Sequence, residues 1–320
     1  MELITVSNLT MQFGEHRALD EVDFTVHSGV TGLVGANGAG KTTFMSIALG
    51  LRAPTTGSIR VLDLEPVADG AKLRSLVSYG PERNILPDEM PAVDFVKHLA
   101  EVRGIPRKEA KTRASDILWL VGLGEERFRP IGTMSTGQRQ RVKLAQAIAA
   151  DPKLVFLDEP TDGLDPNQKF QVRELIKKMA ADKAVIVSTH ILEEVEAVCT
   201  RAVIIAKGQV LIDETPNELL ARSPNQNSLK IEVDKKFANS ICADVGEIDD
   251  VKSTEVLKDF DGKTVIRVFP KDNLNIAINV GAMLKSKGHS IINFSTDKGA
   301  LDEVFRIVTE DMHKGKDQNA

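Results

Sequence analysis

A glycine-rich segment with a single lysine constrains the fold of this chain more than any other feature. The segment reads "GANGAGKTT" (residues 35–43), and it directly follows the apolar run "VTGLV". Apolar residues at helical spacing follow at positions 44–51, so the segment joins a predicted strand to a predicted helix. In this context the phosphate-binding pattern G-x-x-x-x-G-K-[ST] is met by Gly35, Gly40, Lys41 and Thr42.

The physical chemistry of this segment favours a di- or triphosphate ligand. Glycines let successive backbone N–H groups turn toward one anion, and the helix N-terminus adds the positive end of its dipole. Lys41 would then reach the β- and γ-phosphates, Thr42 would bind Mg²⁺, and Thr43 would hold the α-phosphate. A flexible turn with an exposed lysine is the plainer alternative. A nicotinamide cofactor is disfavoured, because G-x-G-x-x-G fails where Thr43 replaces the third glycine.

Acidic and imidazole side chains stand at the ends of two further predicted strands. The run "KLVFLDEP" ends with Asp158 and Glu159, and the run "AVIVSTH" ends with His190. Ligands of parallel sheets bind at the carboxyl ends of strands, so we expect these side chains beside the phosphate loop. There Asp158 can hold Mg²⁺ through water, Glu159 can orient or deprotonate an attacking water, and His190 can contact the γ-phosphate. The alternatives are an acidic pair without a special role and a surface or core histidine.

The segment "MSTGQRQRVKLAQAIAADP" predicts a helix whose N-terminus also suits an anion. Ser135 and Gln138 have the S-x-x-Q spacing of a capping box, and apolar positions 142, 145 and 149 share one face of the helix. A capped helix with no further role explains this pattern. A serine and a glycine at a helix N-terminus also bind phosphate, however, and two chains that lend this end to each other's nucleotide would use both sites.

The order of predicted elements indicates an α/β fold with a helical insertion and a second domain. Residues 1–222 carry short strands, a helical subdomain at about 83–150, and the strands "KLVFLDEP", "AVIVSTH" and "AVIIAKGQVLI", expected to be parallel where helices join them. A Ser, Pro and Asn cluster at 221–228 predicts a linker. Residues 228–310 follow the order of a small α+β ferredoxin-like domain with a last helix, and we expect a disordered tail at 311–320.

Composition narrows the class of protein further. The formal net charge of -5 argues against a chain that coats nucleic acid, so we expect no nucleic-acid partner. Cys199 and Cys242 lie far apart without a C-x-x-C pattern, which indicates neither a disulfide framework nor a zinc site. The N-terminus lacks the features of a signal peptide, and no run of eighteen apolar residues is present. We therefore expect a cytoplasmic protein that does not cross a membrane by itself.

Together these motifs resemble those of the ATP-binding cassette (ABC) family, specifically the ATPase subunits of transporters. The segment at 35–43 is similar to the Walker A loop, "MSTGQ" to the signature, "LVFLDEP" to the Walker B strand, "DGLD" (162–165) to the D-loop, and His190 to the switch histidine. Phe13 stands where an aromatic residue stacks on adenine. The resemblance covers about residues 1–220 and implies ATP contacts by Phe13, Gly35, Asn37, Gly38, Ala39, Gly40, Lys41, Thr42, Thr43, Ser135, Gly137, Gln138 and Asp165.

The resemblance also implies partners. Two ATPase subunits, either a homodimer or closely related chains, would sandwich two ATP molecules, with Ser135 and the Gly137 backbone on the γ-phosphate bound by the other subunit. Their closure would drive a polytopic membrane permease, which would hold the chain on the inner face of the cell membrane. The second domain and its ending "LDEVFRIVTE" look like the extension of subunits that pair with small exporter permeases. The segment around 82–105 would be the docking surface for the permease, or simply packed scaffold.

Two departures from the family pattern matter. The signature usually reads LSGGQ, and here Met134 and Thr136 replace a leucine and a glycine, while the serine and the following glycine remain. In "YGPER", Glu82 stands at the usual glutamine of the Q-loop. A carboxylate about 4 Å from a phosphate charge costs on the order of 4 kcal/mol at an effective dielectric constant near 20. We therefore expect Glu82 either to face Mg²⁺, as a ligand beside Thr42 and Asp158, or to turn away.

Other members of the same family are the main alternatives to a transporter motor. DNA-repair relatives insert long coiled coils between the phosphate loop and the signature, whereas this chain places Lys41 and Ser135 too close for that. Translation-factor relatives carry two cassettes in one chain. A regulatory module without turnover would lack Glu159 or His190, and both are present. P-loop kinases lack the signature and the D-loop.

Overall fold

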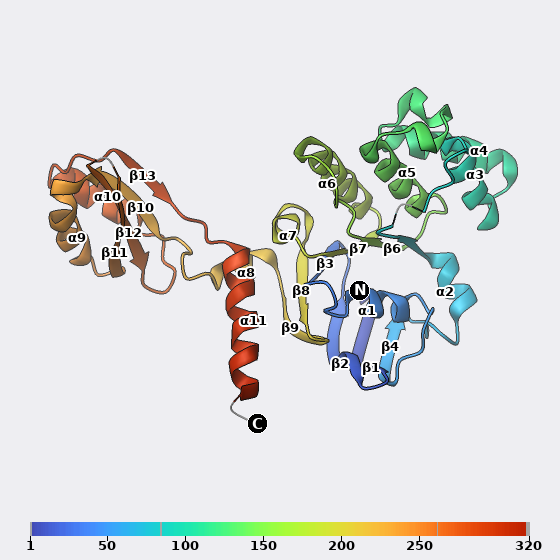
Figure 1. Ribbon diagram of the computed structural model, residues 1–320, viewed down its shortest axis with the longest axis horizontal. Helices are drawn as coiled ribbons and strands as arrows, with labels where there is room; N and C mark the ends of the chain where they lie inside the picture. The colour runs from blue at the N-terminus through green and yellow to red at the C-terminus, as the bar shows by residue number, and fades with distance from the viewer. Residues whose placement is uncertain (1, 84, 261, 318–320) are drawn as a thin grey trace. The chain divides into compact units, whose positions relative to one another are not determined.

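A computed structural model describes residues 2–83, 85–260 and 262–317. The chain divides into two compact units, Met1–Pro216 and Asn217–Ala320, and each is described by itself. Figure 1 shows the course of the chain through both units. The division falls a few residues before the end of the first domain predicted from the sequence. In the described chain, no helix is both long enough and apolar enough to cross a membrane.

A six-stranded sheet forms the centre of the first unit (Figure 1). Its strands, in spatial order, are β5 (Val77–Gly80), β6 (Leu154–Asp158), β7 (Ala184–Thr189), β3 (Val30–Val34), β8 (Arg201–Ala206) and β9 (Gln209–Glu214). The first five strands pair in parallel, and every residue of β3, β6 and β7 is buried. Continuous apolar runs are typical of parallel strands covered on both faces. Because β3, β6 and β7 are parallel neighbours, their carboxyl ends lie at the same edge of the sheet.

The last predicted strand of this unit is two strands. We expected "AVIIAKGQVLI" as one element, but the structure divides it into β8 and β9, which pair antiparallel. Lys207 and Gly208, between them, have φ angles of 49° and 79°. Two successive residues with positive φ form the tight hairpin turn whose twist matches that of the strands. The single-strand prediction was therefore wrong at this turn.

A smaller antiparallel sheet packs with the first helix of the unit. It contains β1 (Ile4–Phe13), β2 (His16–Val26) and β4 (Thr56–Val61) in the order β2-β1-β4. Helix α1 (Lys41–Ala48) shares its apolar core, with the rings of Phe24 and Phe44 4.9 Å apart. This packing fixes the helix that follows the phosphate loop. The short helix α2 (Gly70–Leu76), which we had not predicted, leads into β5.

The remaining helices of the unit surround a second apolar core. Helices α3 (Ala92–Val102), α4 (Arg107–Leu120) and α5 (Thr136–Ile148), with 3₁₀ turns at Gly124–Phe128 and Ile131–Thr133, lie between β5 and β6 in the chain. No strand interrupts this run in the described residues, as the helical spacing of the sequence predicted. Helices α6 (Pro166–Ala180) and α7 (Leu192–Val198) follow β6 and β7.

The second unit combines one antiparallel sheet with helices. Helix α8 (Pro216–Ala221) leads into it, followed by β10 (Leu229–Asp234), a 3₁₀ turn (Lys235–Phe237), α9 (Ala238–Gly246), β11 (Val251–Phe260), β12 (Lys263–Pro270), α10 (Ala277–Ser286) and β13 (Asn293–Thr296). The strand order is β11-β12-β10-β13, and its core includes Ile241, Val245, Val280 and Leu284 of the two helices. This is the order of strands and helices that the sequence predicted for a ferredoxin-like domain.

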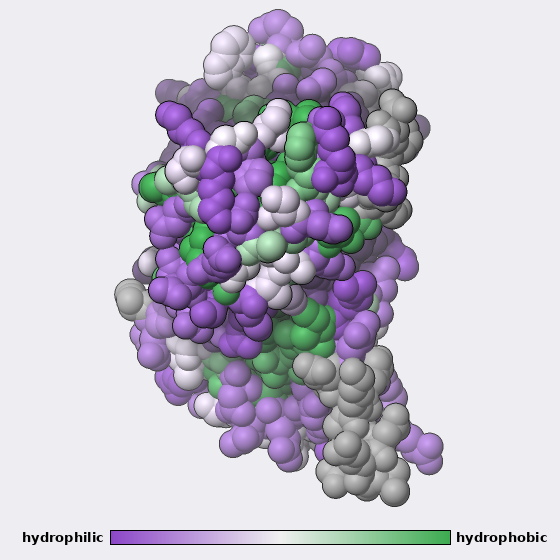
Figure 2. Space-filling view, turned by 90° about the vertical axis from the view of Figure 1, so that its left-hand side faces the viewer, coloured by the Kyte–Doolittle hydropathy of each residue, from purple (hydrophilic) through white to green (hydrophobic). Residues whose placement is uncertain are grey.

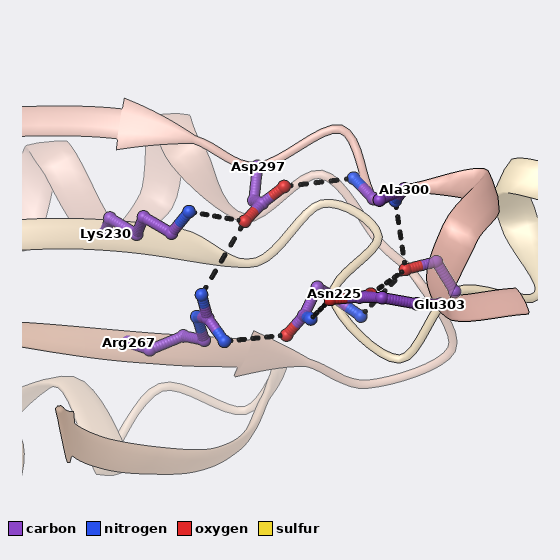
Figure 3. Close-up of polar contacts among 8 residues, drawn as sticks. Asn225, Lys230, Arg267, Asp297, Ala300 and Glu303 are labelled. Carbon is purple, nitrogen blue, oxygen red and sulfur yellow. Dashed lines mark hydrogen bonds and ion pairs between the residues drawn. The ribbon is translucent and has the colours of Figure 1, made fainter. Parts of the chain in front are cut away.

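The predicted linker at 221–228 makes specific polar contacts within the second unit (Figure 3). Asn225 donates from Nδ2 to Glu303 at 2.6 Å and accepts from Arg267 at 3.1 Å, while Ser223 donates to Glu303 at 2.8 Å. Asp297 pairs with Lys230 at 2.7 Å. These contacts tie the segment to the sheet and to α11 (Leu301–Asp317). Charged and amide side chains that meet across turns therefore order part of a segment whose composition indicated only a linker.

Helix α11 extends into the segment for which we expect a disordered tail. It continues past residue 311 to Asp317, and residues 318–320 of the expected tail lie outside the described residues. No proline interrupts "EDMHKGKD", so the backbone hydrogen bonds of the helix can continue through this segment. The face shown in Figure 2 is mostly hydrophilic, with apolar groups among the polar ones.

Candidate nucleotide-binding site

The phosphate loop depends on two glycines where the backbone comes close to other backbone atoms. Gly40 is the N-cap of α1 with φ 113°, and a Cβ atom there would lie 2.5 Å from the carbonyl oxygen of Ala18. A Cβ atom on Gly35 would lie 2.2 Å from the carbonyl oxygen of Ile205. Because Gly40 has no side chain to cap the helix, the first N–H groups of α1 remain available to an anion.

Lys41 is held inside this loop. Its side chain is only 6% exposed, and its ammonium donates to the carbonyl oxygens of Gly35 at 2.6 Å and Ala36 at 3.4 Å. The ammonium also lies 3.7 Å from a carboxylate oxygen of Glu159. These partners stabilise a positive charge that would otherwise be costly to bury. The lysine is therefore placed for a phosphate in advance.

The loop opens into a cavity of about 240 Å³ at the carboxyl end of the parallel strands. Its lining combines backbone and oxygen-bearing side chains with one aromatic ring. The lining residues are Phe13, His16, Ala18, Ala36, Asn37, Gly38, Ala39, Gly40, Lys41, Thr42, Thr43, Glu82, Asp158 and Glu159. The structure thus gathers most of the predicted nucleotide and metal residues at one place, and it adds His16, which sequence analysis missed.

Asp158 is oriented by a tyrosine that sequence analysis also missed. Asp158 ends β6, and one of its carboxylate oxygens accepts a hydrogen bond from the Tyr79 hydroxyl at 3.1 Å. Burial, followed by the charge of Asp158, raises the pKa of Tyr79, so the hydroxyl keeps its proton and remains a donor. Tyr79 lies on β5, the strand beside β6. Tyr79 and Asp158 are distant in sequence, and the pairing of β5 with β6 brings them together.

Glu159 has an unusual backbone conformation. Its φ angle is 45°, in the left-handed region that a non-glycine residue adopts at a cost of about 1–3 kcal/mol. Its N–H donates to the Ser188 carbonyl oxygen at 2.9 Å, and one carboxylate oxygen lies 2.9 Å from Nδ1 of His190. The strained position directs the carboxylate into the cavity, and His190 holds it there. A buried carboxylate with an orienting imidazole suits a general base.

For Glu82 the sequence allows two orientations, one toward Mg²⁺ and one away from the site. Glu82 is among the residues that line the cavity, together with Thr42 and Asp158, and its position as a metal ligand stays a prediction. Carboxylate and hydroxyl oxygens are the donors that Mg²⁺ prefers, so these three residues fit the predicted ion. The carbonyl oxygen of Glu82 accepts a hydrogen bond from Lys143 of α5 at 2.7 Å. Sequence analysis missed Lys143, because its position on the helix gives no sign of the loop it contacts.

The predicted signature segment lies at the start of another helix of the same unit, α5. Ser135 and Gln138 make the reciprocal hydrogen bonds of the predicted capping box at the start of α5. A Cβ atom on Gly137 would lie 2.7 Å from Gln168, whose N–H donates to the Asp165 carboxylate at the start of α6. None of the signature residues, nor Asp165, is among the residues that line the phosphate-loop cavity in the described chain. One chain therefore does not bring the two predicted phosphate sites together.

The aromatic residue predicted to stack on a base lies at the rim of the cavity. Phe13 ends β1, is 41% exposed, and carries the Arg52 guanidinium 5.4 Å from its ring centroid. An exposed ring with a cation on it offers a flat surface for stacking. Its position is that expected for contact with a nucleobase.

Comparisons with known proteins agree with this geometry. A family model described as ABC transporter matches residues 19–162. The chain is 34% identical over 209 residues to the uncharacterized ABC transporter ATP-binding protein YxlF of Bacillus subtilis, covering 65% of this chain and 69% of YxlF. It is 27% identical to the doxorubicin resistance ATP-binding protein DrrA of Mycobacterium tuberculosis, covering 96% of this chain and 94% of DrrA.

The chain is also similar to an export protein and to a solved structure. The Nod factor export ATP-binding protein I of Sinorhizobium fredii is 33% identical, and the match covers 68% of this chain but only 64% of that protein. A solved structure of an ATP-binding subunit of an ABC transporter is 27% identical, with a TM-score of 0.61, over 68% of this chain and 91% of that one.

Proposed function

Because the chain belongs to the ABC transporter family, as one of its ATP-binding ATPase subunits, we propose that two copies of it close on two ATP molecules and drive a separate membrane permease. The observation that carries the proposal is the division of the site. The phosphate loop, Asp158 and Glu159 share one cavity, while Ser135 and Gly137 lie at another helix end of the same chain. A second chain would bring its signature to the first chain's nucleotide.

Each residue of the cavity has a different role in the proposed ATP hydrolysis. Lys41 and the N–H groups at the start of α1 bind the phosphates. Glu159 accepts a proton from a water that attacks the γ-phosphorus, the bond to the bridging oxygen breaks, and ADP and phosphate leave. His190, hydrogen-bonded to Glu159, holds that carboxylate in place. When bound between Thr42, Asp158 and Glu82, Mg²⁺ would supply charge neutralisation for the phosphates.

Export is the direction we propose. One relative is named for Nod factor export, and another for resistance to doxorubicin, which removal of a drug from the cell would give. The permease would hold the chain on the inner face of the cell membrane and choose the substance moved. For the second unit we propose support or regulation of the dimer, because a fold does not specify a function.

The variant Glu159→Gln tests the proposal most directly. We expect the ATPase rate to fall by about a hundredfold or more, because the amide cannot accept the proton. ATP binding should persist, so an ATP-dependent dimer should accumulate, and light scattering coupled to gel filtration measures it. Glu174→Gln, which changes a half-exposed carboxylate of α6 outside the cavity, is the matched control. A wild-type rate, or a monomer at saturating ATP, would contradict the proposal.

The permease requires a separate experiment. We expect the tagged chain to copurify with a polytopic membrane protein encoded beside it and to hydrolyse ATP faster when a transported compound is added. Recovery of the chain with ribosomes or nucleic acid in place of a membrane protein would favour the soluble relatives.

A further inference from the structure

Helix α5 carries a buried lysine that the proposed hydrolysis does not use. Lys143 is 4% exposed, and its ammonium donates to the carbonyl oxygen of Glu82 at 2.7 Å. It lies two helical turns beyond the capping box of Ser135. The side chain therefore joins the helix that begins at the signature to the loop that enters the ATP cavity.

The surroundings of Lys143 are rich in carboxylates. Burial lowers the pKa of Lys143, and the charges of Glu82, Asp158 and Asp162 act in the opposite direction. A buried ammonium is costly unless it is paired or hydrogen-bonded, and a group of carboxylates beside a phosphate site is costly without a cation. Lysine and carboxylates therefore stabilise each other.

A neighbouring side chain holds the loop on the other side of Asp158. Gln140, three residues before Lys143 on α5, donates to the carbonyl oxygen of Pro160 at 2.5 Å and is also buried. Residues three apart on a helix share a face, so these two side chains reach two different loops from one side of α5. The loop at Glu82 and the loop after Glu159 are thus fixed to the same helix.

We propose that Lys143 is a positioning residue for ATP, whose ammonium offsets the Glu82 carboxylate and fixes the loop of Glu82 to α5. The proposal rests on the proposed function, because it assumes that the cavity holds a triphosphate. Without Lys143, the carboxylate charge of Glu82, a residue that lines the cavity, would repel that triphosphate. With a neutral amide at position 82, the same loss should matter much less.

A double-mutant cycle on the full-length chain tests this charge compensation. ATP affinity is measured by fluorescence titration, in EDTA and in Mg²⁺, for wild type, Lys143→Met, Glu82→Gln and the double variant. In EDTA we expect Lys143→Met to weaken binding about tenfold in the wild-type background and less than about threefold in the Glu82→Gln background. Lys143→Arg should stay within about threefold of wild type, since it keeps the charge. Lys108→Met, an exposed charge loss on α4, controls for net charge.

A merely structural role for Lys143 gives a different result. If Lys143 only held the Glu82 carbonyl, its loss would cost the same in both backgrounds, and that outcome would overturn the proposal. Thermal melting of each variant checks folding, and Lys143→Gln replaces Lys143→Met if the latter does not fold. Failure of both to fold, without rescue by Glu82→Gln, would also overturn it. ATP-dependent dimers of Glu159→Gln report the proposed function separately, since a single chain suffices for the affinity cycle.

Discussion

The phosphate-loop cavity and the signature end of α5 are both suited to phosphate, but they differ in how complete they are. In the first, a buried lysine, helix N–H groups and three acidic residues line one cavity. In the second, the hydroxyl oxygen of the exposed Ser135 accepts a hydrogen bond from the backbone of its own helix. The groups that line the cavity come from several elements of the fold, whereas the hydrogen bonds of the Ser135 cap are made within the first turn of α5.

In the proposed function, this difference gives the two sites different roles. Groups that bind the nucleotide must be fixed before it arrives, because ordering them on binding would cost affinity. A helix end that completes the site from a second chain must instead remain accessible. We therefore expect changes in the cavity to affect ATP binding by one chain, and changes at the signature to affect turnover by two.

Lys41→Ala should have the largest effect. We expect ATP affinity to fall by about a hundredfold, because the variant removes a charged donor from a cavity where water cannot replace it well. Isothermal titration of the full chain measures this, with Lys108→Ala as the matched control and thermal melting as the check on folding. ATP affinity equal to wild type would show that the cavity is not the primary phosphate site.

Changes at Ser135 should have a smaller effect, confined to turnover. Asn and Asp both cap helices well, so Ser135→Asn and Ser135→Asp should leave α5 intact. We expect Ser135→Asp to reduce the ATPase rate about thirtyfold, because it places a carboxylate against a partner's γ-phosphate. Ser135→Asn should lose clearly less, and ATP affinity of the single chain should change little. Equal ATPase rates for Ser135→Asn and Ser135→Asp would contradict the proposal that the signature end contacts a partner's γ-phosphate.

Tyr79→Phe should have the smallest effect of the three. It keeps the ring but removes the hydroxyl that donates to Asp158. We expect the Mg²⁺ concentration for half-maximal ATPase activity to change by about three- to tenfold, because the carboxylate loses an orienting hydrogen bond. Titration of the ATPase rate with Mg²⁺ measures it. If ATP affinity in EDTA changed equally, Tyr79 would support the cavity as a whole and not the metal site.

Sequence patterns predicted the parts of the site that depend on local geometry. The segment from Gly35 to Thr43 needs only consecutive glycines, a lysine and a helix start, and the capping box of Ser135 needs only a spacing of three. The helical insertion and the element order of the second unit also followed from periodicity. The structure differs from the expected elements where a two-residue turn divides β8 from β9 and where α11 continues past residue 311.

Contacts between distant segments lay beyond those patterns. Tyr79 meets Asp158 because β5 and β6 are neighbours in the sheet, and Lys143 meets Glu82 because α5 packs against the loop after β5. Strand order is set by the burial of whole faces, which no short stretch of sequence encodes. The strained φ of Glu159 likewise depends on its hydrogen bond to Ser188 of the next strand.

The sequence by itself therefore predicted which groups would serve for phosphate, for a metal ion and for a proton, because those predictions depend on short-range backbone geometry. The tertiary structure alone decided which of those groups share a cavity and which are left at a separate helix end. It also decided which buried cation faces which carboxylate. The physical reason is that these encounters depend on how sheets and helices pack, and packing is a property of the whole unit.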